Sequence, residues 1–291
     1  MSGLDKIVQT AHENVAAGKY YEALMQYKSL FTRFSRRSIE QGMMIIQDGV
    51  DLLSKQSDLN AYYGLIDFIV KFFEGKQNQI NEKTIKPFES IISLEPSEDK
   101  IKYEEMILRL IQSTGVTDSI EKIKMDLGFT YLKLKQMHKA LDYLLISSTT
   151  VTELLNYIKE NKENFIQFMD VFYLHIVFKL MLSSNQILAR NVYKFIQEQF
   201  NEILNKETTQ FAVILTVLIM KVIEKKDDIK EIAAVFEKTV KKYESMIQEK
   251  GFVQFVGVVR NKYFVQQNQQ QSNAANPFAS FMQSMMGANA N

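Results

Sequence analysis

The sequence contains no cysteine, and glycine and proline are scarce, with 11 and 3 copies among 291 residues. A chain without cysteine forms no disulfide and offers neither a thiolate nucleophile nor a thiolate metal ligand. This composition suits a reducing compartment and argues against secretion. A β-rich fold makes its many turns from glycine and proline, so their scarcity predicts an all-α protein.

A charge excess of either sign and a long apolar run are missing as well. Lys and Arg number 35 against 34 Asp and Glu, so no global field would attract a nucleic acid or an acidic membrane. The longest apolar run, residues 211–220, is about half of the ~20 residues that cross a bilayer, and Lys221 ends it. We therefore expect a buried core helix there, no direct membrane insertion and no nucleic-acid partner. Charged residues near the N-terminus also predict that no signal peptide is present.

Helical periodicity, by contrast, runs through almost the whole sequence. Apolar residues recur at helical spacing from Leu4 to Val265, and short polar, glycine or proline segments interrupt them. The interruptions fall near Gly18, Ser35, Ser57, Gly75, Pro96, Gly115, Lys135, Asn161, Asn185, Lys206, Asp227 and Gly251. About fourteen helices, or about seven antiparallel pairs, would result. Because the composition does not change before the last two dozen residues, we expect one extended right-handed α-solenoid over residues 1–265 rather than two compact domains.

Three stretches match the spacing of tetratricopeptide repeats, in which small residues let one helix approach its neighbour closely. The matched positions are Ala11, Asn14, Ala23, Tyr27 and Leu30, then Gly128, Tyr131, Ala140, Leu144 and Ser147, then Val177, Leu180, Ala189, Tyr193 and Ile196. A fourth, weaker copy runs through Leu30, Arg33, Gly42, Ile46 and Gly49. The small residue and the large residue one turn later lie on one helix face. The spacing therefore predicts helix pairs of the tetratricopeptide type.

A crowd of aromatic residues towards the C-terminus allows two interpretations. Its members are Phe165, Phe168, Phe172, Tyr173, Phe178, Phe195, Phe200, Phe211, Phe236, Phe252 and Phe255. We expect these side chains to form the core of the last helix pairs. The alternative is an exposed apolar patch that docks a partner, since the last repeat of a solenoid has no neighbour to cover it.

One local concentration of positive charge also allows two interpretations. It consists of Lys28, Arg33, Arg36 and Arg37. The nearby acidic residues Glu22, Glu40 and Asp48 would keep the region nearly neutral, which favours a solvated face. The alternative is a charged docking surface, because an end repeat presents its outer helices to partners.

The C-terminal tail differs from the rest of the chain. No charged residue follows Lys262, and residues 266–276 form a Gln/Asn/Ser/Ala tract with too little apolar surface to offset ordering entropy. We expect a disordered linker there. Asn276 and Pro277 suit a helix start, and the residues after them carry an apolar stripe at helical spacing. The stripe consists of Phe278, Phe281, Met282, Met285 and Met286. It predicts a short amphipathic helix that folds on binding in a partner's groove; the alternative is an unstructured tail.

No catalytic or metal-binding motif is present in the sequence. It has no P-loop, no dinucleotide-binding glycine motif and no nucleophile elbow. His12, His138 and His175 lie far apart, and His175 stands in an apolar segment typical of a core histidine. Carboxylate pairs such as Glu104–Glu105 stand amid lysines, as on a solvated helix face. We therefore expect no enzyme, no cofactor and no metal; a helical enzyme would need polar residues clustered inside a concave face.

The N-terminal repeat resembles a known family in its sequence. Gly18-Lys-Tyr20-Tyr21-Glu22-Ala23 is followed by Gln26, Tyr27, Leu30, Arg33 and Phe34, and then by Ile45-Ile46-x2-Gly49-x2-Leu52-Leu53-x2-Gln56. This order closely resembles the N-terminal signature of the Get-four family (guided entry of tail-anchored proteins, factor four). Weaker similarity continues through Leu94-Glu95-Pro96, residues 128–145, Asn276-Pro277-Phe278 and Met285-Met286-Gly287.

The resemblance implies a cytosolic α-solenoid adaptor. Its N-terminal repeats would hold the targeting ATPase of the Get-three type, and its C-terminal repeats a ubiquitin-like-domain subunit of the Get-five type. The complex would pass tail-anchored membrane proteins to the ATPase for insertion into the endoplasmic reticulum. The other possibility is an unrelated tetratricopeptide-like scaffold, for instance of a proteasome-lid or trafficking complex.

Three residues correspond to partner-binding positions of the family. Tyr20 matches the first tyrosine of the Tyr-Tyr-Glu motif, Arg36 a basic residue just beyond Arg-Tyr, and Asp58 the aspartate of Asp-Leu. The resemblance implies that all three lie on the ATPase-facing side. An aromatic anchor beside one cation and one anion would combine apolar contact with charge complementarity. For Tyr20, the alternative is packing within its own repeat.

Overall fold

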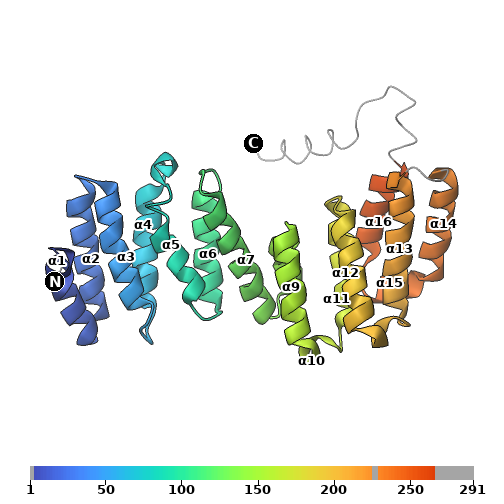
Figure 1. Cartoon of the computed structure of the whole chain (residues 1–291), viewed down its shortest axis with the longest axis horizontal. Coiled ribbons are helices and arrows are strands. Elements are labelled where there is room, and N and C mark those ends of the chain that lie inside the picture. The colour runs from blue at the N-terminus through green and yellow to red at the C-terminus, as the bar shows by residue number, and fades with distance from the viewer. Residues whose placement is uncertain (1–2, 225–228, 266–291) are drawn as a thin grey trace, which may run out of the picture. The chain divides into compact units, whose positions relative to one another are not determined.

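The computed structural model describes residues 3–224 and 229–265 as helices joined by turns, and none of these residues lies in a strand (Figure 1). The expected all-α class is confirmed. Contacts divide the chain into two compact units, Met1–Thr150 and Val151–Asn291, and each is described by itself. The expected Gln/Asn linker and Phe/Met helix lie outside the described residues.

The first unit is a series of long helices that pack mainly against their neighbours in the chain. Its elements are α1 (Gly3–Ala16), α2 (Tyr20–Ser35), α3 (Ile39–Leu53), α4 (Asn60–Phe73), η1 (Gln77–Gln79), α5 (Lys86–Glu89), η2 (Ser90–Ser93), α6 (Glu98–Ile111), α7 (Thr117–Lys133) and α8 (Met137–Leu144). Contacts join α1 to α2, α2 to α3, α3 to α4, α4 to α6, α6 to α7 and α7 to α8. Such contacts between successive helices are typical of a helical-repeat fold.

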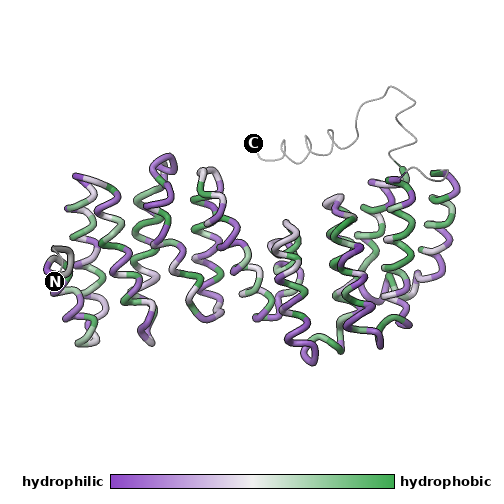
Figure 2. The backbone as a smooth tube through the Cα atoms, viewed as in Figure 1, coloured by the Kyte–Doolittle hydropathy of each residue, from purple (hydrophilic) through white to green (hydrophobic). Residues whose placement is uncertain are grey.

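The second unit is arranged around α11 and α13. Its elements are α9 (Ser148–Glu160), α10 (Lys162–Phe165), α11 (Met169–Leu182), α12 (Gln186–Gln199), η3 (Asn201–Ile203), α13 (Glu207–Glu224), α14 (Ile229–Lys242), α15 (Glu244–Glu249), α16 (Val253–Arg260) and the π-helical turn η4 (Asn261–Val265). Helix α11 contacts α12, α13 and α16 and is buried nearly all round. Helix α13 is apolar along much of its length (Figure 2). None of the described helices combines the length and apolarity needed to span a bilayer.

Helix ends fall close to the predicted interruptions. Gly18, Gly75 and Gly251 adopt positive φ angles of 71°, 74° and 74°, as residues in left-handed turns after helices do. The break near Asp227 lies outside the described residues. Three further breaks, after α8, after α10 and after α14, have no predicted interruption, and the described residues form sixteen α-helices.

The central alanines of the three matched repeats face inward, as predicted. Ala23, Ala140 and Ala189 are fully buried. Gly128 lies so close to α8 that a Cβ atom there would come within 2.6 Å of Leu144 Cγ. The small residues therefore set the distance between paired helices.

The aromatic crowd forms the core of the second unit, and none of its members is exposed. Phe178 stacks on Phe252 with ring centroids 5.4 Å apart, and Phe236 stacks on Phe264 at 4.4 Å. His175 lies between these elements, with its ring 4.4 Å from Phe252. The core interpretation of both the aromatic residues and His175 is confirmed.

The expected solvated position of Glu104 is wrong, because its side chain is fully buried. Helical spacing places Glu104 on the same face of α6 as Lys100, Ile107 and Ile111, which are also buried. Lys100 Nζ lies 2.7 Å from Asp126 Oδ2 of α7 and donates to the carbonyl oxygen of Leu94 at 2.7 Å. Burial, followed by the neighbouring Asp126 carboxylate, raises the pKa of Glu104 far above its usual range. Burial therefore favours the neutral form of Glu104, which lies beside an ion pair between the buried Lys100 and the partly exposed Asp126.

Candidate protein-interaction site

Helix α2 has one buried face and one face that points outward. Its buried face consists of Ala23, Leu24, Tyr27 and Phe31. Phe31 packs edge-on against Phe68 and Phe72 of α4, with ring centroids 5.4 and 4.8 Å apart. These contacts hold α2 against α4 and fix the direction of its other face.

A polar cluster ties α2 to its two neighbours. The Tyr27 hydroxyl donates to Asp48 Oδ2 of α3 at 2.7 Å, and His12 Nε2 of α1 lies 2.7 Å from the same oxygen. Burial, followed by the hydrogen bond to Asp48, raises the pKa of Tyr27 above its usual value. Asp48 is therefore engaged within the first repeat.

Of the four cations of the basic group, Lys28 and Arg33 lie on the outward face of α2, and Arg36 and Arg37 follow directly after this helix, which ends at Ser35. All four line an open groove of about 580 Å³ together with Met25, Ser29 and Thr32. Lys28 Nζ lies over the ring of Phe68, 5.5 Å from its centroid, and Arg33 lies over Phe34 at 5.9 Å. Within the described part of the chain, no carboxylate forms an ion pair with Arg36 or Arg37.

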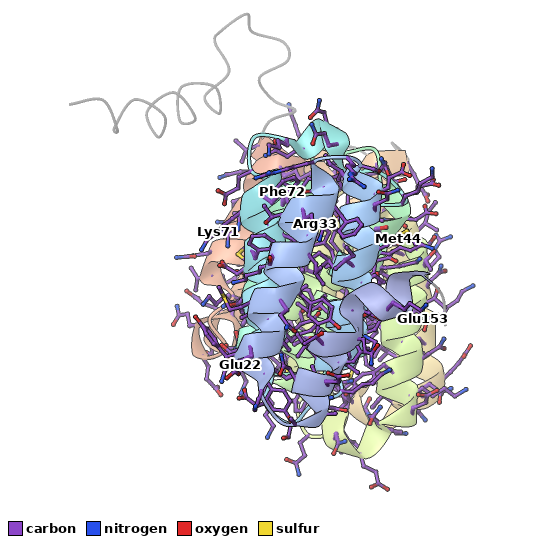
Figure 3. All side chains as sticks on the ribbon, turned by 90° about the vertical axis from the view of Figure 1, so that its left-hand side faces the viewer. Glu22, Arg33, Met44, Lys71, Phe72 and Glu153 are labelled. Carbon is purple, nitrogen blue, oxygen red and sulfur yellow. The ribbon has the colours of Figure 1, made fainter. Side chains whose placement is uncertain are left out.

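The acidic neighbours in sequence do not neutralise this groove. Glu40 pairs with Lys83 at 3.2 Å, and Asp48 is occupied by Tyr27 and His12. Glu22 stands near the start of α2 and Arg33 near its end, as Figure 3 shows. Among the described residues, none of these three carboxylates forms an ion pair with a cation of the groove.

Large apolar side chains lie exposed beside the cations. Tyr21 is 69% exposed and Met25 48% exposed on α2, and Met44 of α3 is 58% exposed. Met44 lies to one side of α2, and Lys71 and Phe72 of α4 lie to the other (Figure 3). A second hollow of about 630 Å³ adjoins Met44, and its lining residues are Glu40, Met43, Met44, Gln47, Glu82, Lys83, Lys86 and Pro87. Exposed apolar groups beside cations are the usual composition of a protein-binding surface.

Two of the three predicted site residues lie at one end of this helix. Tyr20 is the first residue of α2 and is half-buried, and its hydroxyl donates to Gln56 Oε1 at 3.4 Å. Asp58, two residues beyond Gln56, is exposed, and its Oδ1 accepts from the Asn60 amide at 2.9 Å, at the start of α4. Tyr20 and Asp58 are therefore near each other.

The third residue, Arg36, lies at the opposite end of α2. The helix has 16 residues, which corresponds to about 24 Å of length. The structure therefore brings Arg36 together with Arg33 and Arg37 and not with Tyr20 or Asp58. The exposed member of the Tyr20–Tyr21 pair is Tyr21.

A family model described as Golgi to ER traffic protein 4 matches residues 36–286. The match covers most of the 291 residues. The chain belongs to this family. No curated protein matches the sequence significantly. Membership in the Golgi to ER traffic protein 4 family implies involvement in Golgi-to-ER traffic and the targeting of tail-anchored proteins, in a family of helical adaptors that act within a targeting complex.

The family match includes some of the predicted site residues and leaves out one. Arg36 and Asp58 lie within it, as does the Phe/Met stripe of the tail, whereas Tyr20 lies before it. Tyr21, Met25 and Met44 were not among the predicted site residues. The signal for Tyr21 and Met25 was present in the sequence. Positions 21, 25, 28, 32 and 36 follow one another at intervals of three or four residues, which places them along one outward stripe of a helix.

The described residues of this family member offer no metal centre. No three His, Asp or Glu side chains among residues 3–224 and 229–265 gather so that they could hold a metal ion. Lys100 forms an ion pair with Asp126 inside the first unit, and the buried Glu104 beside them has no hydrogen-bond partner for either carboxyl oxygen. Their arrangement is that of a structural cluster.

Proposed function

We propose that the chain is a non-enzymatic adaptor of the cytosolic complex that delivers tail-anchored membrane proteins to a targeting ATPase. The first unit would hold the ATPase, of the Get-three type, through the outward face of α2. The observation that carries this proposal is the unneutralised cation groove flanked by Tyr21 and Met25. Family membership supports the pathway.

The charge and the apolar groups of this face have different expected effects. Clustered cations steer an acidic partner and raise its association rate in a salt-dependent way. Exposed aromatic and methionine side chains contribute buried apolar area once the partner is bound. A reversible adaptor interface needs both properties.

Charge reversal of the groove tests this site. We expect Arg33→Glu, Arg36→Glu and Arg37→Glu together to weaken ATPase binding about tenfold or more at physiological salt, or about 1.4 kcal/mol. The matched control is Lys133→Glu, an exposed lysine at the end of α7 in the same unit, which should leave binding unchanged. Titration calorimetry at two salt concentrations measures both. Equal affinity of the triple variant and the control would refute the assignment.

The other end of α2 is tested separately. If Tyr20 and Asp58 belong to the same ATPase interface as Arg36, the single variants Asp58→Lys and Arg36→Glu should each weaken ATPase binding. Intact binding of both variants at physiological salt would place the ATPase on another face. Loss only with Arg36→Glu would restrict the interface to the cation end.

The second unit would hold a ubiquitin-like-domain subunit of the Get-five type. This assignment follows the family's complex and assigns no individual residue. Co-purification of the full chain from native extract tests it, with the bound proteins identified by mass spectrometry. Recovery of proteasome-lid or unrelated trafficking subunits in place of a ubiquitin-like protein and an ATPase would favour the tetratricopeptide-like scaffold.

A further inference from the structure

An apolar hollow lies on the surface of the second unit between α12 and α13. It has a volume of about 240 Å³, and its lining residues are Ile187, Arg190, Met220, Ile223 and Glu224. Arg190 Nη2 lies 3.8 Å from Met220 Sδ, so Arg190 borders the hollow at its middle. The two helices are antiparallel there, because residue 187 shares the hollow with residue 223 and residue 190 with residue 220.

The side chains around this hollow are unusually exposed for their size. Ile187 is 77% exposed, and Val217, one turn before Met220 on α13, is 49% exposed. Ile223 is exposed as well. Together they form an apolar strip, which we call the α12–α13 strip, defined by Ile187, Val217, Met220 and Ile223. Apolar side chains grouped in this way mark a surface that another segment covers.

The described chain ends close to this strip. Lys262 Nζ donates to the Leu182 carbonyl at the end of α11 and, at 2.8 Å, to Ser184 Oγ. The Tyr263 hydroxyl donates to the Met181 carbonyl. These bonds hold η4 against the α11–α12 turn. Ile187 follows Ser184 by three residues, so the two Cα atoms are at most about 11 Å apart.

The rest of the chain can reach the strip from there. From Val265 to Phe278 the sequence advances 13 residues, and a chain of that length can span at most about 45 Å. No residue after Lys262 is charged, so the tail can cover apolar surface without burying a charge. The residues at 278, 281, 282, 285 and 286 are all Phe or Met.

We propose that the Phe/Met stripe of residues 278–286 docks on the α12–α13 strip of its own chain. The tail supplies one row of large apolar side chains, and the strip supplies the hollow and the exposed isoleucines that receive them. A short tether keeps its segment at roughly millimolar local concentration, so even weak intrinsic affinity keeps the site occupied. The proposal concerns only the second unit and is independent of ATPase docking by the first.

The absence of cysteine allows a direct test in the full-length chain. Arg190→Cys places a thiol at the hollow, and Gln283→Cys places one beside the stripe; both substitutions keep every apolar side chain of the proposed contact. The matched control combines Gln283→Cys with Lys238→Cys, an exposed position on α14. Phe236 of that helix stacks on Phe264, the residue before Val265. An undocked tail would therefore reach both positions.

A short bis-maleimide reagent, with peptide mapping by mass spectrometry, measures the linkage. We expect the Arg190 pair to crosslink within the chain about tenfold faster than the Lys238 pair, independently of protein concentration. Phe281→Asp in the tail, or Ile187→Asp with Ile223→Asp on the exposed strip, should lower that rate to the control value. Equal rates for the two pairs would overturn the proposal. Crosslinks that form between two chains and disappear on dilution would also overturn the proposal. They would show that the tail of a second copy occupies the α12–α13 strip.

Discussion

At the scale of single residues, Glu104 differs most from the sequence-based expectation. Its charged neighbours in the sequence predict a solvated position, but its side chain is buried. Lys100 is 2% exposed and Glu104 is fully buried, and Asp126 completes the cluster from α7. Burying charges costs free energy unless they compensate one another. One ion pair with one neutral acid is the arrangement with the least uncompensated charge.

The pKa of Glu104 leads to a prediction about pH. In the folded state burial raises this pKa, whereas in the unfolded chain it lies near 4.3. Above about pH 4.3 the unfolded state loses its proton first, so Glu104 lowers the free energy of unfolding by up to about 1.4 kcal/mol per pH unit. Glu104→Gln, which is permanently neutral, should therefore gain stability relative to the parent protein between pH 5 and 8.

Urea unfolding at several pH values, followed by circular dichroism, measures this difference. Glu121→Gln, at an exposed position of α7, is the control and should follow the parent protein. A constant difference between Glu104→Gln and the parent across this range would show that Glu104 is ionised in the folded state.

At the scale of helices, close approach is decided by small residues at a few positions. Gly128 of α7 faces Leu144 and Tyr143 of α8, and an added Cβ would lie 2.6 Å from Leu144 Cγ and 3.2 Å from Tyr143 Cβ. Gly49 of α3 meets Tyr27 and Leu65 at about the same closeness, 3.0 and 2.9 Å. The helix pairs therefore have no room for a methyl group at these points.

Gly128→Ala should separate α7 from α8 and destabilise the first unit. We expect a cost of about 1–3 kcal/mol, because overpacking outweighs alanine's better helix propensity. Thermal and urea unfolding measure the change. Gly115→Ala is the matched control in the same unit, since a Cβ there meets nothing within 4 Å. If Gly128→Ala is as stable as the control, α7 and α8 can relax apart without loss.

At the scale of the whole molecule, the chain consists of two units, each with its own core. The first is built from successive helices up to α8, and the second around α11 and α13. Nearest-neighbour contacts make the stability of such units a sum of local terms. Under the proposed function, the two units would present separate surfaces to separate partners.

A fragment of residues 1–150 should therefore fold alone and keep the ATPase site. We expect a cooperative unfolding transition and an ATPase affinity within about threefold of the full chain, or about 0.7 kcal/mol. Circular dichroism and titration calorimetry measure the two properties. A fragment that folds but does not bind would move the ATPase site out of the first unit, and an unfolded fragment would show that the first unit depends on the second.

Much of this molecule was predictable from local sequence. The helical class, most helix ends and the inward positions of Ala23, Ala140 and Ala189 depend on periodicity and turn residues, which act over a few residues. The Get-four resemblance indicated the family, and the match to residues 36–286 bears it out.

Pairings between distant residues needed the tertiary structure. Glu40 pairs with Lys83, and Asp48 with Tyr27 and His12, so these carboxylates form no ion pair with the nearby cations Lys28, Arg33, Arg36 and Arg37. Tertiary packing also decided three other features. They are the separation of Arg36 from Tyr20 and Asp58, the burial of Glu104 and the division into two units. Sequence by itself determined which residues form helices and which helix face is apolar, because those choices depend on local spacing. The fold decided which charges meet, because those partners lie 21 to 43 residues apart in the chain.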